Sequence, residues 1–264
     1  MFRIGVKYLQ YLLSSVGRHG VHSPFVYKLL TQVIYDKMQY PAYKRIEGLR
    51  KQLRKNQHIL TLQDFGAGGE QNPTYTRTIA QIAKASAKPR KYAQVLYRLC
   101  AYHQPKYMLE LGTSLGISTA YQAMGAQQGQ NTIEFTSLDG SPAVAEQARK
   151  NLDGVGINGE VTIGIGNFDE VLTEHLQNFP QLDYVFFDGN HRYQPTIDYF
   201  LQCLPLAHEN TLFVFDDIRW SDEMERAWEE IKNHSQVTIT VDLFFIGLVY
   251  FHKGQTKQHF TLRF

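Results

Sequence analysis

The sequence contains only two cysteines among its 264 residues, Cys100 and Cys203, and both stand in apolar helical segments. Two buried thiols do not make the disulfide framework of a small secreted domain, and they are typical of a reducing compartment. No group of cysteines and histidines has the spacing of a zinc site. The sequence therefore predicts a cytoplasmic protein without a structural zinc.

Apolar runs of membrane-spanning length are also absent, because such a helix needs about 20 apolar residues. Residues 2–16 carry apolar side chains at helical spacing, but Arg3, Lys7 and Gln10 interrupt them, and no signal-peptide core is present. We expect an amphipathic helix that packs on the domain or on a second subunit, with a membrane-surface helix as the alternative. The expectation is thus no stable membrane insertion and a possible homodimer through the N-terminal helices.

Neither sign of charge dominates, since the sequence has 27 Lys and Arg residues, 25 Asp and Glu residues and a formal net charge of +2. This balance argues against nucleic acid as the main partner. Basic residues do gather early in the chain, and glutamine and apolar residues interrupt them, which favours a solvated helix face. The six in question are Lys44, Arg45, Arg50, Lys51, Arg54 and Lys55.

The chain has two regions that differ in their predicted secondary structure. Residues 1–104 indicate helices and loops, whereas strands and helices alternate from residue 106 onward, which predicts an α/β fold with a parallel sheet. Helices are expected at 23–34, 43–55, 76–87, 91–102 and 143–152. Strands are expected at 107–111, 133–138, 161–165, 184–187 and 212–215, followed by a closing pair at 237–241 and 247–251.

The strand at 107–111 ends in an acid and runs directly into a glycine turn that reads Glu110-Leu111-Gly112-Thr113-Ser114-Leu115-Gly116-Ile117-Ser118. Glycines without a Cβ let the backbone turn sharply and let a ligand come close. The helix that follows offers free N–H groups and a positive dipole end to an anion. The pattern does not fit the dinucleotide fingerprint G-x-G-x-x-G, and an ordinary βα turn is the alternative.

A second strand-to-glycine segment, residues 59–69, competes for the role of cofactor loop. A nucleoside site needs another strand that ends in an acid about twenty residues later. Residues 83–88 lie at that distance from Gly66 and are helical and lysine-containing, whereas Gly116 is followed at that distance by a strand ending in Asp139. We therefore assign the cofactor to the later loop, and interpret residues 64–69 as a lid, a substrate-side loop or a structural turn.

Asp139 can accept hydrogen bonds from both hydroxyls of a ribose, although aspartate is also common in turns. The turn after the strand at 161–165 contains Asn167 and Phe168. Phe168 could stack on an adenine, and Asn167 or Asp169 could pair with its exocyclic amine. A helix cap and a core phenylalanine are the alternatives.

Three acids follow two further strands: Asp188 ends one, and Asp216 and Asp217 end the next. Ligands of an open parallel sheet bind beyond the carboxyl ends of its strands. Converging carboxylates repel each other unless a cation joins them, and all-oxygen ligation suits Mg²⁺, Mn²⁺ or Ca²⁺. The three acids therefore predict a metal site, and helix capping is the alternative.

The glycine loop resembles the first motif of class I S-adenosylmethionine (SAM) methyltransferases, especially O-methyltransferases with E-L-G-T-x-x-G-x-S. This resemblance implies a Rossmann-like doubly wound seven-stranded sheet whose last strand is antiparallel, spanning residues 105–264, with a helical, substrate-side extension at 1–104. It implies SAM as the cofactor. The residues expected to contact it are Glu110, Gly112, Thr113, Ser114, Gly116, Ser118, Asp139, Asn167 and Phe168.

The acids extend the resemblance to metal-dependent O-methyltransferases. The catechol and caffeoyl-CoA type carries Asp and then Asp-Asn at these strand ends, and this chain has Asp217 in place of the Asn. His191 stands three residues after Asp188, where the catechol type has a lysine base; Asp-Gly-x-His-x-Tyr is closer to the enzymes that act on sugars and macrolides. The resemblance implies a cation, with Mg²⁺ expected, held by Asp188, Asp216 and Asp217.

The resemblance also implies a reaction in which the cation acidifies a hydroxyl of a small-molecule acceptor, His191 takes the proton and the oxygen attacks the SAM methyl group, with Asp188 and His191 as the catalytic residues. Two alternatives stay open. One is a metal-independent SAM methyltransferase on another acceptor atom, and the other is a non-catalytic nucleotide-binding or interaction protein.

Overall fold

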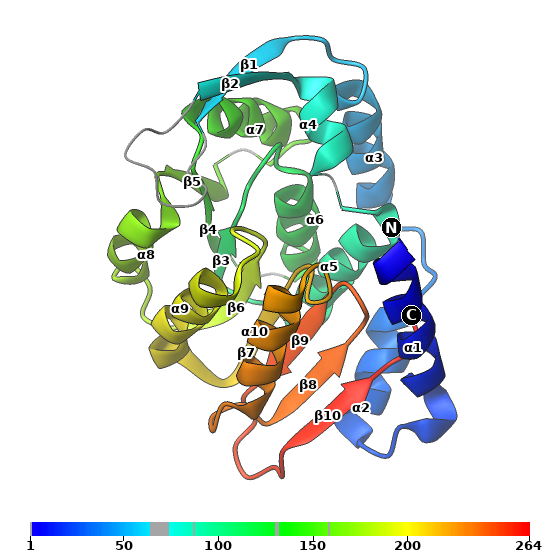
Figure 1. Ribbon diagram of the computed structural model, residues 1–264. Helices are drawn as coiled ribbons and strands as arrows, with labels where there is room; N and C mark the ends of the chain where they lie inside the picture. Colours follow the sequence, from blue (N-terminus) through cyan, green and yellow to red (C-terminus); the bar gives the residue numbers. More distant parts are fainter. Residues whose placement is uncertain (1, 64–73, 87, 130–131, 158) are drawn as a thin grey trace. The chain divides into compact units, whose positions relative to one another are not determined.

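The computed structural model describes residues 2–63, 74–86, 88–129, 132–157 and 159–264. The chain divides into two compact parts. The central part is Lys37–His175, and the terminal part combines Met1–Asp36 with Leu176–Phe264. Figure 1 labels the helices and strands of each part. In the described residues, no helix is both long and apolar enough to cross a membrane.

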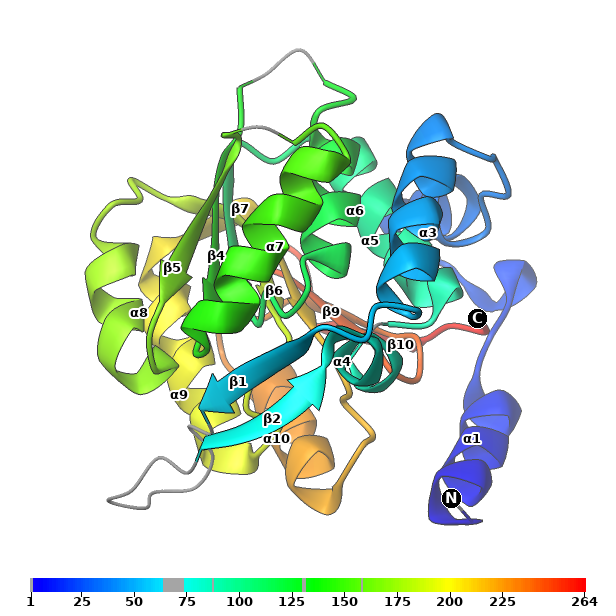
Figure 2. The ribbon, with the colours of Figure 1, turned by 90° about the horizontal axis from the view of Figure 1, so that it is seen from above.

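The central part is built on three parallel strands. β4 pairs with β3 and with β5, and this register places Leu111 opposite Leu138 and Asp139 opposite Ile165. Helix α7 lies against β4 and β5 and also against β1, as Figure 2 shows. The elements are α3 (Pro41–Leu53), β1 (Ile59–Gln63), β2 (Thr74–Thr78), α4 (Ile79–Ala85), α5 (Arg90–His103), β3 (Tyr107–Leu111), α6 (Ile117–Ala126), β4 (Glu134–Asp139), α7 (Pro142–Gly154), β5 (Val161–Ile165) and α8 (Phe168–Leu176).

Helix α6 is the innermost helix of the central part, because every one of its residues is buried. It packs against α5 and α3. Gly125 permits the approach of α5, since a Cβ there would lie 2.2 Å from the carbonyl oxygen of Tyr97. α6 begins at the glycine turn after β3, so its burial fixes the place of that turn.

The terminal part contains five neighbouring strands in the order β10-β8-β9-β7-β6. β6 and β7 are parallel, and β9 runs antiparallel to β7 and β8. The elements are α1 (Phe2–Ser14), a 3-10 turn (Arg18–Gly20), α2 (Pro24–Leu29), a π-helical turn (Leu30–Ile34), β6 (Leu182–Phe187), α9 (Tyr193–Cys203), a 3-10 turn (Leu204–Leu206), β7 (Ala207–Phe215), α10 (Asp222–Asn233), β8 (Ile239–Asp242), β9 (Gly247–Tyr250) and β10 (Gln258–Thr261).

Aromatic side chains form the core around β6 and β7. The rings of Phe187 and Phe215 stack at 4.3 Å between centroids, with 2° between their planes. Gly247 leaves room for the Trp228 ring of α10, because a Cβ at that glycine would lie 2.6 Å from it. The carboxyl ends of β6 and β7 are therefore held by close packing directly beneath the acidic residues.

The two ends of the chain meet in the terminal part (Figure 1). Tyr11 of α1 donates its hydroxyl to the carbonyl oxygen of Leu262. The backbone of Val16 donates to Thr261 at 2.9 Å, and Arg263 donates back to Val16 at 3.0 Å. The amphipathic N-terminal helix thus packs on its own chain, which is one of the two positions expected for it.

The predicted α/β class with alternating parallel strands is confirmed, and so is the antiparallel β9. Apart from the β1–β2 pair, the described residues form eight strands, one more than the seven expected; the addition is β10, which pairs with β8. The helix predicted at 76–87 is wrong at its start. Residues 74–78 pair with β1, and Thr78 caps a helix that begins at Ile79.

Candidate functional site

The glycine loop after β3 is shaped by three residues with positive φ: Gly112 (110°), Ser114 (46°) and Gly116 (77°). The N–H groups of Gly112 and Thr113 both donate to the carbonyl oxygen of Leu138, at 2.9 and 3.1 Å. A Cβ on Gly116 would come within 3.4 Å of Leu152. The loop is therefore tied to the end of β4, and α6 begins directly after it.

Glu110 anchors this loop from inside the fold. Its side chain is fully buried, and its carboxylate accepts hydrogen bonds from Gln122 Nε2 at 2.7 Å, from Ser137 Oγ at 2.6 Å and from the Thr119 hydroxyl. Burial raises the pKa of the Glu110 carboxyl, and these donors act in the opposite direction. This arrangement joins β3, β4 and α6. A contact of Glu110 with SAM stays a prediction.

Thr113, Ser114 and Ser118 line or flank the same loop. The hydroxyls of Thr113 and Ser137 lie 2.6 Å apart in the interior, whereas the hydroxyl of Ser114 lies 2.8 Å from that of Ser86 at the end of α4. Ser118 is buried in the first turn of α6. Ser114 is therefore the loop hydroxyl on the partly exposed side.

Asp139 stands at the carboxyl end of β4, beside the loop. Its Oδ2 accepts the N–H of Ser114 and its Oδ1 accepts the N–H of Ser141, each at 2.8 Å. Burial raises the pKa of the Asp139 carboxyl, and the two backbone donors lower it. Each oxygen keeps a second lone pair, so the carboxylate can still accept hydrogen bonds from two ribose hydroxyls.

Asn167 and Phe168 lie where β5 passes into α8. Asn167 Oδ1 accepts the backbone N–H of Asp169 at 3.3 Å, so this side chain takes part in the turn that starts the helix. Phe168 is half-buried. The capping role considered for Asn167 is thus present, and the contact of either residue with an adenine stays a prediction.

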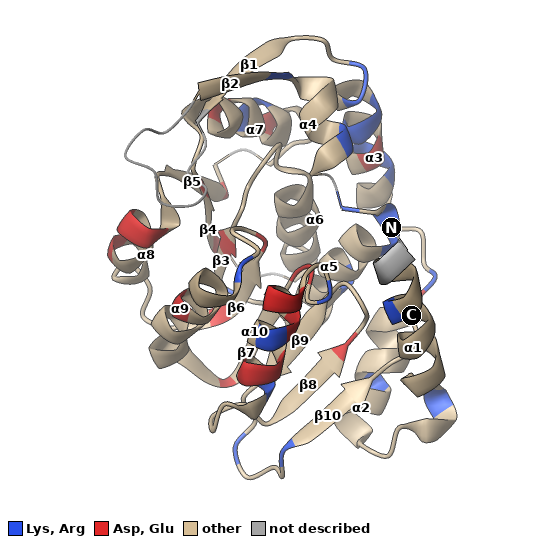
Figure 3. Ribbon diagram, in the orientation of Figure 1, with Lys and Arg blue, Asp and Glu red and all other residues tan. Residues whose placement is uncertain are grey.

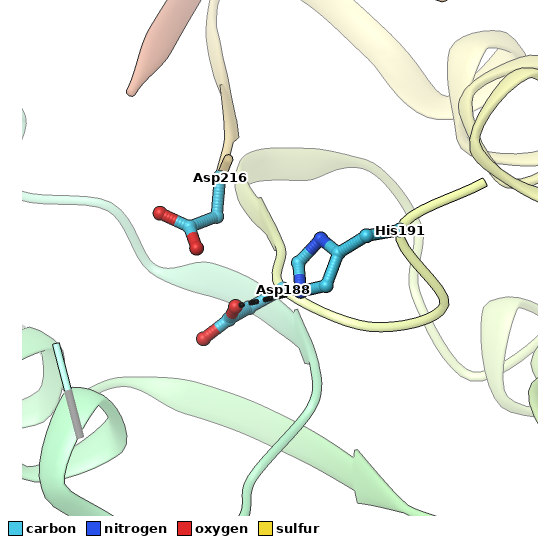
Figure 4. A group of neighbouring side chains, drawn as sticks. All are labelled: Asp188, His191 and Asp216. Atoms are coloured by element: carbon cyan, nitrogen blue, oxygen red, sulfur yellow. Dashed lines mark ion pairs between the residues drawn. The ribbon is translucent and has the colours of Figure 1, made fainter. Parts of the chain in front are cut away.

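A second group of side chains lies in the terminal part, at the carboxyl ends of β6 and β7. Asp188, His191 and Asp216 each offer a ligand atom, and these atoms all lie within 4.8 Å of one another (Figure 4). Asp216 is 2% exposed, and its backbone N–H donates to the carbonyl oxygen of Phe187 at 2.9 Å. The parallel pairing of β6 and β7 therefore brings the two aspartates together.

The imidazole of His191 lies close to two of the acidic side chains. Its Nε2 is 3.6 Å from Asp188 Oδ1 and 4.0 Å from Asp217 Oδ2. Asn190, with φ of 52°, turns the chain before it, and the amide of Asn190 donates to the Tyr199 hydroxyl at 3.2 Å. The compact group thus contains His191, the predicted base, while Asp217, predicted as a metal ligand, lies 4.0 Å from its Nε2.

This donor set fits a divalent cation. Two carboxylates supply hard oxygen ligands for Mg²⁺, Mn²⁺ or Ca²⁺, and an imidazole nitrogen widens the choice toward transition metals. Asp217 has a φ of 52° and reaches the imidazole, so its carboxylate lies at the edge of the same group.

Trp220 is a residue of this region to which the sequence reasoning gave no role. It follows the two aspartates after β7, its side chain is 58% exposed, and its backbone N–H donates to Asp217 at 2.9 Å. A large aromatic ring so exposed within four residues of Asp216 is a candidate contact for a planar ligand. Its position shortly after Asp216 and Asp217 is the sequence feature that could have identified it.

Residues 109–218 match the family model described as a methyltransferase domain. Over this span the chain is similar to methyltransferase domains. This span holds the glycine loop, Asp139 and the Asp188–His191–Asp216 group. The resemblance noted from the sequence is confirmed at this level.

Two curated relatives are catechol O-methyltransferases. That of Niastella koreensis is 32% identical over 129 residues, which cover 48% of this chain and 55% of the relative. That of Bos taurus is 26% identical over 185 residues, which cover 67% of this chain and 65% of the relative. The matched chain spans less than two thirds of either relative.

Solved structures share the fold. The O-methyltransferase from Bacillus cereus in complex with SAH is 18% identical, with a TM-score of 0.57 over 82% of this chain and 93% of that one. An SAH-bound methyltransferase from Podospora anserina is 13% identical, with a TM-score of 0.60 over 88% and 98%. At these identities the likeness concerns the fold alone.

Proposed function

We propose that this protein transfers the methyl group of SAM to a hydroxyl oxygen of a small-molecule acceptor, with the help of a divalent cation. The observation that carries the proposal is the convergence of Asp188, His191 and Asp216 within 4.8 Å at the ends of β6 and β7. Catechol O-methyltransferase relatives and a methyltransferase domain support the same reaction class.

In the central part, the residues of the glycine loop would bind and orient the cofactor. Asp139 would accept the ribose hydroxyls, since its carboxylate is already held by two backbone donors. The N-terminal turn of α6 offers backbone N–H groups to the cofactor's carboxylate. Glu110 contributes indirectly, because its buried hydrogen bonds hold the loop in place.

In the terminal part, Asp188 and Asp216 would hold the cation, with Asp217 at the edge of the group. The bound cation would lower the pKa of an acceptor hydroxyl as a Lewis acid. His191 would take the hydroxyl proton, because its Nε2 lies within the same group as the carboxylates. The acceptor oxygen then bonds to the methyl carbon as the carbon–sulfur bond of SAM breaks, and SAH leaves.

The acceptor would be a compound with a planar ring and adjacent oxygens. Trp220 offers an exposed face for stacking beside the aspartate loop. A catechol is the first acceptor to test, because it is the acceptor in the names of the two curated relatives. A panel of catechols, single phenols and sugar diols would separate ring stacking from simple chelation.

Activity after EDTA treatment tests the proposal. Purified protein is treated with EDTA, desalted and assayed with labelled SAM and the acceptor panel, with and without added Mg²⁺ or Mn²⁺. We expect no turnover until the cation is restored, while SAM binding persists. Full activity in EDTA would remove the cation from the reaction and leave a metal-independent methyltransferase.

A further inference from the structure

Arg219 links the loop after β7 to two neighbouring elements. Its guanidinium donates to Oδ2 of Asp242 at the end of β8, and it lies 5.8 Å from the centre of the Phe244 ring. A second guanidinium nitrogen lies 4.0 Å from Glu225 in the first turn of α10. The cluster of acidic residues on α10 in Figure 3 includes this glutamate.

Asp242 is held from both of its carboxylate oxygens. Oδ1 accepts the backbone N–H of Phe244 at 2.7 Å, and Oδ2 accepts Arg219. The residue is 6% exposed. A buried carboxylate with this geometry fixes the turn between β8 and β9, and it fixes Arg219 to that turn.

The backbone of the loop after β7 is fixed at the same place. Ile218 donates its N–H to the carbonyl oxygen of Phe245 at 3.2 Å, and Trp220 donates to Asp217 at 2.9 Å. Between them, Asp217 takes a φ of 52°, which a residue with a side chain keeps only when its surroundings hold it there. The loop conformation thus depends on its contacts with the β8–β9 turn.

Helix α1 covers this turn from the other side. The rings of Tyr8 and Tyr11 lie 4.9 and 5.2 Å from that of Phe244. Lys7 pairs with Glu225 at 2.9 Å, the same glutamate that faces Arg219. The first helix, the β8–β9 turn and α10 therefore surround Arg219 and leave its side chain only 24% exposed.

We infer that Arg219 is a positioning residue for the cation group. Its bond to Asp242 holds the loop after β7 so that the carboxylate of Asp216 faces Asp188 and His191. The inference rests on the proposed function, because positioning matters only if this group binds a cation. Groups hydrogen-bonded to metal ligands typically change metal affinity 10- to 100-fold when they are removed. Arg219 acts through the loop and not by a direct bond to a ligand, so we expect the lower end of this range.

The test compares Mn²⁺ binding with SAM binding in the full-length protein. Mn²⁺ is titrated by the paramagnetic resonance of the free ion in the presence of saturating SAH, and SAM is titrated by calorimetry. The variants are Arg219→Gln, Asp242→Asn, the double variant and Arg219→Lys. Asp183→Asn is the matched control, because it removes the charge from a 2.8 Å pair with His208 at the opposite ends of β6 and β7.

We expect Arg219→Gln to weaken Mn²⁺ binding by about tenfold or more, with SAM affinity within twofold of the wild type. Asp242→Asn should act in the same direction, and the double variant should be no worse than the poorer single variant, because both remove one interaction. Arg219→Lys should recover part of the loss. The control should leave both affinities unchanged.

Wild-type Mn²⁺ affinity in both Arg219→Gln and Asp242→Asn would overturn this inference and leave the proposed function standing. Asp242→Asn alone decides the question if Arg219→Gln does not fold. Failure of the wild-type protein itself to bind Mn²⁺ would overturn the proposed cation site instead, so the two failures are distinguishable.

Discussion

The backbone N–H of Ser114 donates to Oδ2 of Asp139 across 2.8 Å, so the glycine loop after β3 is tied directly to the acid that ends β4. Ser141 holds the other carboxylate oxygen at the same distance. The carboxylate is thus oriented by the protein before any ligand arrives. Such preorganisation lowers the entropic cost of binding a nucleoside.

Asp139→Asn should weaken SAM binding. An amide can accept only one of the two backbone N–H groups, so its nitrogen would face the other donor and the loop would shift. We expect a loss of about 2 kcal/mol, or about thirtyfold in dissociation constant, by calorimetry. Asp153→Asn, at an exposed position near the end of α7, is the control. SAM affinity within twofold of the wild type would show that Asp139 is only a turn residue.

Gly112→Ala should reduce both stability and SAM affinity. The φ of 110° at Gly112 is rarely adopted by a residue with a Cβ, and forcing it costs about 1–3 kcal/mol. Urea unfolding measures the first effect and SAM titration the second. Gly154→Ala is the matched control, because a Cβ at that position meets nothing within 4 Å. If Gly112→Ala has both the free energy of unfolding and the SAM affinity of the wild type, the assignment of this loop to the cofactor is refuted.

The raised pKa of the Glu110 carboxyl predicts that the free energy of unfolding depends on pH. Burial raises the pKa of its carboxyl above the ordinary value of 4.5, so the folded state binds more protons than the unfolded state between these two pKa values. Stability contributed by this group is therefore present below pH 4.5 and is lost as the pH rises through the folded-state pKa. Urea unfolding at a series of pH values from 4.5 upward should show this loss in the wild type.

The Glu110→Gln variant is the comparison for this profile, because it cannot titrate. Its free energy of unfolding should change less over the same pH range. The exposed Glu170→Gln variant serves as the control and should keep the wild-type slope. Equal slopes in the wild type and Glu110→Gln would mean that the Glu110 carboxyl titrates alike in both states.

Much of the fold follows from short apolar runs that end at glycines or acids. The strands predicted at 107–111 and 161–165 have these bounds in the structure, because both are short, mostly apolar runs between turn residues. β10 was missed since its four residues are polar or half-exposed and depend on β8 for their pairing. Residues 74–78 also depend on a partner strand, β1, which local pattern does not reveal.

The candidate site was predictable where it depends on strand ends. Asp188 and Asp216 meet because β6 and β7 are parallel neighbours, which the βαβ alternation indicated. The approach of His191 depends on the left-handed turn at Asn190, and the support of Arg219 depends on Asp242, 23 residues further on. Contacts of that range need the folded chain. The boundary predicted near residue 104 and the SAM contacts stay predictions, and residues 64–69 lie outside the described part.

Substitution of His191 distinguishes two roles for its imidazole at the cation group, general base and metal ligand. As the general base it removes the hydroxyl proton, and His191→Gln should then lower kcat by about a hundredfold or more. Mn²⁺ affinity should stay within threefold of the wild type, because Asp188 and Asp216 keep the cation. SAM affinity should not change, since the substitution leaves the glycine loop and Asp139 intact.

The measurements are kcat with saturating acceptor, Mn²⁺ binding and SAM binding on the same preparations. His208→Gln is the control, because that histidine also pairs with an aspartate but at the amino ends of β6 and β7. If His191→Gln loses Mn²⁺ binding as strongly as Asp216→Ala does, the imidazole is a ligand and the base must be sought elsewhere. Asp217 is then the next residue to substitute, because its Oδ2 lies 4.0 Å from the His191 ring nitrogen.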